Sequence, residues 1–141
     1  MIRIPALGAA LLFAFAAAGC GDDMEEKEKE AAGKACGTAP AALASKPQLP
    51  AGFPTPDGVT YTATREAGPS TIADGYFAGD IDKAFEAYKD AFPKAGYDVT
   101  KDEQEEADAE VNFAGGGSDG HVKLVQECRD RTSVSITARP K

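Results

Sequence analysis

The chain has 141 residues, and its 23 acidic and 15 basic side chains give a formal net charge of −8 at pH 7. This length suits one domain. An acidic chain without a basic cluster binds nucleic acid poorly, because neutralisation of phosphates supplies most of that affinity, so we expect no nucleic-acid partner. Anionic lipid headgroups repel the same charge, which therefore offers no electrostatic route to a membrane.

The first twenty residues carry the most specific pattern. Arg3 precedes an apolar run from Ile4 to Ala18, which Gly19 and Cys20 follow. A positive start, an apolar run and small residues before a cut are typical of a secretory signal peptide. With a cysteine directly after it, the stretch resembles the lipobox of bacterial lipoproteins. In that family the chain is cut before the cysteine, which carries diacylglycerol on sulfur and usually an acyl chain such as palmitate on nitrogen.

The resemblance implies a signal peptide over residues 1–19 and an extracytoplasmic protein held on a bacterial membrane through lipid on Cys20. A secreted protein without lipid and an uncleaved anchor are the alternatives, but the apolar run of about 15 residues is short of the roughly 20 that span a bilayer. In Gram-negative lipoproteins, aspartate directly after the cysteine resembles an inner-membrane retention signal. Gly21 stands there instead, which favours the outer membrane if the host has one.

The sequence has three cysteines, an odd number for an exported protein. If Cys20 carries lipid, Cys36 and Cys128 remain, and an exported domain favours pairing them. Two free thiols or a redox site are the alternatives. Redox dithiols are usually close in sequence, as in Cys-x-x-Cys, whereas these two lie far apart. We therefore expect a structural disulfide.

Two segments without a regular pattern precede the domain. Residues 20–35 are rich in Asp, Glu and Lys and have few apolar positions, which indicates a solvated tether, with cation binding as the alternative. Residues 36–58 contain five prolines and so favour extended chain. Leu49 and Phe53 are the apolar positions expected to pin this strap onto the domain.

Residues 59–141 are expected to form the folded domain. Asp80 is a good helix N-cap, and apolar positions recur at helical spacing from Ile81 to Ala95. Residues 102–108 and 115–120 are predicted as an acidic loop and a flexible glycine-rich turn. Alternating residues predict strands over 59–64, 71–78, 97–100, 111–113, 122–128 and 134–138. The fold class is thus α+β, an antiparallel sheet of about five to six strands with one helix packed on one face, in the order β-β-α-β-β-β-β.

Side chains able to carry chemistry are few. His121 is the one histidine, and Ser118 and Asp119 beside it match no catalytic motif, so we assign no catalytic residue, no transition-metal site and no cofactor. Calcium is a weak possibility at the acidic stretch, which lacks the pattern of an EF-hand and reads better as a solvated loop. The candidate ligands there are Asp102, Glu103, Glu105, Glu106 and Asp108.

These observations favour a lipid-anchored, non-enzymatic binding module of the cell envelope, whose partner is an envelope protein, a cell-wall component or a small solute. One alternative is a small extracytoplasmic hydrolase that uses acidic residues, for which two facing carboxylates in a pocket would be the mark. Another is a structural accessory subunit of an envelope complex, for which a broad exposed apolar patch would be the mark.

Overall fold

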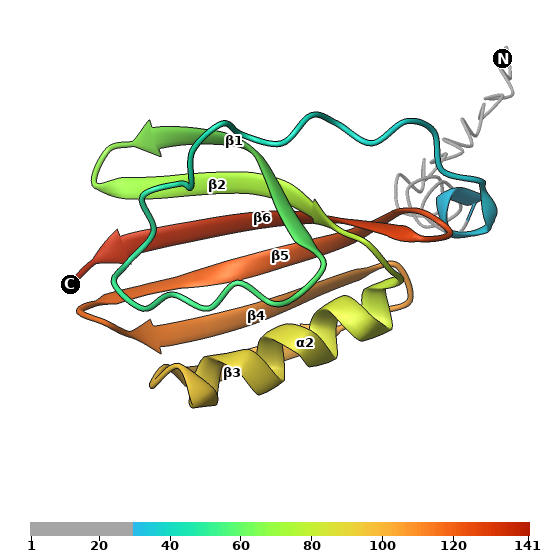
Figure 1. Ribbon diagram of the computed structural model, residues 1–141. Coiled ribbons are helices and arrows are strands. Elements are labelled where there is room, and N and C mark those ends of the chain that lie inside the picture. Colours follow the sequence, from blue (N-terminus) through green and yellow to red (C-terminus); the bar gives the residue numbers. More distant parts are fainter. Residues whose placement is uncertain (1–29) are drawn as a thin grey trace, which may run out of the picture.

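The computed structural model describes residues 30–141, which form a six-stranded sheet and one main helix (Figure 1). The α+β class and the antiparallel sheet are confirmed. Residues 30–33 add a short helical stretch that the sequence did not predict. The predicted signal peptide, Cys20 and the first part of the tether lie outside the described residues. The elements are β1 (Val59–Ala67), β2 (Ser70–Phe77), α2 (Ile81–Lys94), β3 (Asp98–Gln104), β4 (Asp108–Gly115), β5 (Ser118–Cys128) and β6 (Arg131–Pro140).

The strand order across the sheet is β1-β2-β6-β5-β4-β3, and every neighbouring pair is antiparallel. It follows that β2 and β3 run in the same direction with three strands between them. Such a connection cannot be a hairpin and needs a crossover. Helix α2 makes that crossover and contacts β3, β4, β5 and β6 (Figure 1).

Helix α2 forms where its sequence signals predict. The Asp80 carboxylate accepts a hydrogen bond of 3.0 Å from the backbone N–H of Lys83, which satisfies one of the free donors of the first turn. Gly96, with φ of 81°, follows the last turn in a backbone conformation that favours glycine. The apolar face is buried against the sheet. Within residues 30–141 no helix is both long and apolar enough to cross a membrane.

The core lies between one sheet face and a cover made of α2 and part of the strap. Phe53 of the strap is half-buried, and Leu49 and Phe53 pack against the core, which confirms that expectation. The Phe53 ring centroid lies 5.5 Å from that of Phe92 on α2 and 5.2 Å from that of Phe113 on β4. The strap thus crosses the same face of the sheet as the helix (Figure 1).

The predicted loop over residues 102–108 is wrong, because only residues 105–107 lie between strands. Strand β3 continues to Gln104 and pairs with β4, with Asp102 opposite Val111 and Gln104 opposite Ala109. An edge strand with exposed side chains can carry charges at nearly every position, and backbone pairing on its inner side holds it in place. The charges therefore hid the period of two that marks a half-buried strand.

The predicted flexible turn over residues 115–120 is also too long. Only Gly116 and Gly117, with φ of 57° and 73°, separate β4 from β5. Two residues with positive φ match the twist of a tight hairpin, which explains the glycines. Gly120 lies inside β5 for a different reason: a Cβ there would come within 2.9 Å of Cζ of Phe113 and still closer to the carbonyl oxygen of Thr137.

Candidate functional site

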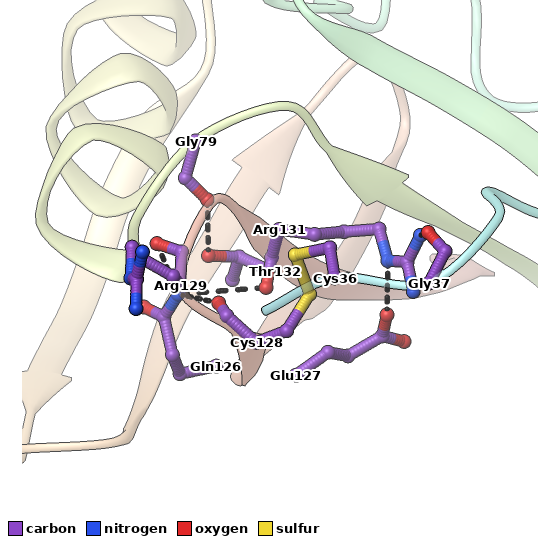
Figure 2. Close-up of polar contacts among 9 residues, drawn as sticks. All are labelled: Cys36, Gly37, Gly79, Gln126, Glu127, Cys128, Arg129, Arg131 and Thr132. Carbon is purple, nitrogen blue, oxygen red and sulfur yellow. Dashed lines mark hydrogen bonds and ion pairs between the residues drawn. A yellow bond between two sulfur atoms is a disulfide. The ribbon is translucent and has the colours of Figure 1, made fainter. Parts of the chain in front are cut away.

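The start of the strap is fastened to the β5–β6 hairpin. The predicted disulfide between Cys36 and Cys128 is confirmed, with the two Cα atoms 5.2 Å apart (Figure 2). Beside it, the backbone N–H of Arg129 donates a hydrogen bond of 2.8 Å to the carbonyl of Lys34. The tether therefore joins the domain at the end of the sheet that holds this hairpin.

Arg131 adds a second fastening. Its Nε lies 2.7 Å from the Glu127 carboxylate, and its Nη1 donates a hydrogen bond of 3.2 Å to the carbonyl of Gly37 in the strap (Figure 2). The guanidinium also lies 5.9 Å from the centre of the Tyr76 ring, within the range of a cation–π contact. We name the disulfide, with the bonds from Arg129 and Arg131 to residues 33–37, the clasp.

A buried glutamine, Gln126, connects the clasp to α2. This connection was not predicted from the sequence. Oε1 of Gln126 accepts a hydrogen bond of 2.7 Å from the N–H of Ile81. Nε2 of the same side chain donates one of 2.5 Å to the carbonyl of Cys128 (Figure 2). The hydroxyl of Thr132 donates to the carbonyl of Gly79 at 2.9 Å. The alternation along β5 could have predicted this burial, because Gln126 stands in the inward-facing series Val122, Leu124, Gln126, Cys128.

The opposite face of the sheet, which we call the free face, is covered by neither α2 nor the packed part of the strap. Side chains alternate along each strand, so the neighbours of core residues such as Val122 and Ile136 point to the free face. His121 of β5 lies there directly between Asn112 of β4 and Thr137 of β6. It is a half-exposed strand residue.

A depression of about 450 Å³ opens on the free face around His121, and we name it the free-face depression. It lies toward the β4–β5 turn and the chain end, opposite the clasp. Its volume falls within the range of small-molecule sites. Side chains from five strands, β2 to β6, line it, among them those of Ser70, Thr100, Asn112, His121, Thr137 and Arg139.

Cationic groups stand at one end of the free-face depression. Nε and Nη2 of Arg139 lie 3.1 and 2.9 Å from Oδ1 of Asp119, and the Arg139 side chain is 60% exposed. An ion pair this exposed adds little stability, but it orients the guanidinium. Lys141 also lines the depression, and its backbone N–H donates to the carbonyl of Gly117 at 3.0 Å.

The calcium candidates do not converge on one point. Asp102 faces the helix side and forms an ion pair of 3.1 Å with Lys89, which raises the pKa of that ammonium. Glu103 faces the free face and forms one of 2.7 Å with Lys101. Glu105 and Glu106 lie in the β3–β4 turn, and Asp108 begins β4. Among residues 30–141, no three His, Cys, Asp or Glu side chains are placed to hold a metal ion together.

The residues beside the histidine do not form a triad either. Ser118 is 8% exposed and lies on the core side of β5, whereas Asp119 and His121 are on the free face. The Asp119 carboxylate pairs with Arg139. A nucleophile and its base must be within hydrogen-bond reach of each other, and the alternation of the strand separates these two.

Comparison of the chain with protein-family models, with curated proteins and with solved structures found no match. Within residues 30–141, we argue function from the clasp and the free-face depression. The sequence located the two cysteines of the clasp. It did not locate the depression, because residues from different strands meet there only after the strands pair.

Proposed function

We propose that this protein is a lipoprotein of the bacterial envelope, anchored through lipid on Cys20, that presents its free face as a non-enzymatic binding surface outside the cytoplasm. The outer membrane is the proposed location where the host has one. The disulfide between Cys36 and Cys128 carries the proposal, because structural disulfides persist in oxidising compartments. The disulfide takes two of the three cysteines, and Cys20 is the one that remains.

The position of the clasp supports the orientation that an anchored binding module needs. The tether enters the domain beside Cys128, at the last residue of β5. His121 stands seven positions earlier on the same strand, which corresponds to roughly 25 Å at the rise of an extended chain. On an anchored protein the free-face depression is therefore turned away from the bilayer and toward material outside it.

Lipid labelling tests the anchor. The chain is expressed in a bacterium grown with a palmitate analogue that can be coupled to a dye, and the label is followed in membrane fractions of the native protein and of Cys20→Ala. We expect label and membrane retention for the native protein only. Lys94→Gln, on the exposed side of α2, is the matched control and keeps both. Unlabelled native protein, or a Cys20→Ala form that stays in the membrane, contradicts the proposal.

A further inference from the structure

We infer that the free-face depression binds a saccharide that carries a carboxylate. This inference rests on the proposed function, since it takes the free face as the surface that meets ligands outside the cytoplasm. It goes further by naming the ligand chemistry. Two observations support it: polar side chains that the protein itself leaves without partners, and cationic groups confined to one end of the depression.

The first observation concerns the neutral polar side chains that line the depression. Those of Ser70, Thr100, His121 and Thr137 make no hydrogen bond to any of the residues that the structure describes. A hydroxyl both donates and accepts, as does a neutral imidazole through its two nitrogens. Several such groups in one small depression suit a ligand with many hydroxyls, which can donate and accept in turn.

Other polar side chains of the free face have partners within the protein. The hydroxyl of Ser135 donates a hydrogen bond of 2.7 Å to the Asp74 carboxylate, which also pairs with Arg65. At the clasp end, Arg131 is held by Glu127. The polar side chains at these places already satisfy one another. Ser133 also has no hydrogen-bond partner within residues 30–141, but it stands alone between Tyr76 and Val125, whereas several unpartnered side chains line the one depression.

The second observation is the distribution of charge. Arg139 and Lys141 are the cationic side chains of the depression. Asp119 holds the Arg139 guanidinium by its Nε and Nη2 edge, and Nη1 makes no hydrogen bond to any of residues 30–141. A planar guanidinium with free N–H groups is well suited to a carboxylate. A second, smaller depression on the free face holds four carboxylates around Lys123 and would repel an anion.

The size of the depression sets the size of the ligand. About 450 Å³ in an open depression accommodates one or two sugar rings rather than a folded partner. The sugar hydroxyls would lie over the row of Asn112, His121 and Thr137, and the carboxylate at Arg139. A polymer could continue beyond the depression, because the depression is open to solvent.

The test uses the protein purified from the expressing cells, with its native processing, and titration calorimetry with matched disaccharides. N-acetylglucosaminyl-N-acetylmuramic acid carries a carboxylate and di-N-acetylchitobiose does not. Digalacturonate, whose carboxylates are on the rings, distinguishes uronic-acid polymers from muramyl sugars. We expect at least one acidic disaccharide to bind about tenfold or more tightly than the neutral one, since a hydrogen bond to a charged group contributes on this scale.

Two variants separate the two parts of the inference. Arg139→Gln is expected to lower the affinity for the acidic disaccharide about tenfold and to leave the affinity for the neutral one unchanged. Thr137→Val is expected to weaken all of them about threefold, because it removes one neutral hydrogen-bonding group of similar shape. Lys94→Gln, on α2 and so on the other side of the sheet, should change the affinity for none of the disaccharides. A melting curve for each variant confirms that it is folded.

Equal affinity for acidic and neutral disaccharides overturns the role of the carboxylate. Absence of binding to all three by folded protein overturns the saccharide inference, as does preference for a peptide carboxylate over every sugar. None of these results bears on the lipid at Cys20, which the labelling experiment measures separately. Failure of that labelling, with saccharide binding intact, would instead overturn the anchor.

Discussion

Loss of the disulfide is the perturbation for which the structure gives the clearest magnitude. The double variant Cys36→Ala, Cys128→Ala opens a loop with a sequence separation of 92 residues. The entropy of closing a loop of that length corresponds to about 4–5 kcal/mol at 25 °C. Because small domains have a total stability of about 5–15 kcal/mol, we expect the variant to be only marginally folded.

Urea denaturation followed by circular dichroism measures this loss. We expect the midpoint to fall and the m-value to rise, because the unfolded variant is no longer cross-linked and exposes more surface. The melting temperature should fall by roughly 20 °C for a domain of about 110 residues. Native protein in excess reductant should reproduce both changes, whereas Cys20→Ala in the oxidised state should reproduce neither.

The effect should also be localised in the native state. The amide of Arg129 donates to Lys34, and we expect its hydrogen-exchange protection to fall once the strap end is released. Leu43 lies farther along the strap, and its amide donates to the carbonyl of Tyr61 in β1. This amide should lose less protection, since Phe53 still holds the strap to the core. A loss of less than about 1 kcal/mol with an unchanged m-value would refute the reasoning that loop closure stabilises this fold.

Three further predictions concern single side chains, each measured by urea denaturation. Gln126→Leu should lower the free energy of unfolding by about 2 kcal/mol, since it leaves the Ile81 N–H buried without a partner. The control Gln48→Leu, at an exposed position, should change it little, and equal effects of the two substitutions would contradict this prediction. Tyr88→Phe should change the free energy of unfolding by less than about 1 kcal/mol, because the buried Tyr88 hydroxyl interacts with that of Tyr61 but makes no hydrogen bond of normal geometry within residues 30–141. The Lys83 N–H lowers the pKa of Asp80 below its ordinary 3.8, so the stability from this cap is present above that value and lost as pH falls through the lowered pKa. Asp80→Ala should therefore cost about 1 kcal/mol at pH 7 and progressively less in acid, and a cost that persists unchanged in acid would argue against a charged cap.

Much of the fold follows from local patterns in the sequence. The period of 3.6 and the N-cap at Asp80 are properties of a short stretch of chain, so α2 could be assigned without its neighbours. The alternation from Ser133 to Ala138 likewise identifies β6, because one of its faces is buried. The cysteine pair follows from counting and from the redox compartment that the predicted signal peptide implies.

What the sequence could not supply depends on pairing between distant strands. Strand β3 has four charged side chains among its seven residues, and its pairing with β4 compensates for a pattern that looks like a loop. The amide of Gln126 finds partners on α2 and in the β5–β6 turn, which only the folded chain brings together. The wrong prediction for β3 and the omission of Gln126 have the same origin, since a residue's own type does not show which distant backbone groups it will meet.

The sequence by itself determined the helix, the alternating strands, the paired cysteines and the expectation of a lipid-anchored protein. The tertiary structure alone decided which residues line the free-face depression. Ser70, His121 and Arg139 belong to different strands, and they line one depression because β2, β6 and β5 are neighbours in the sheet. The physical reason is that strand order and register are collective properties of the sheet, whereas capping and periodicity are local ones.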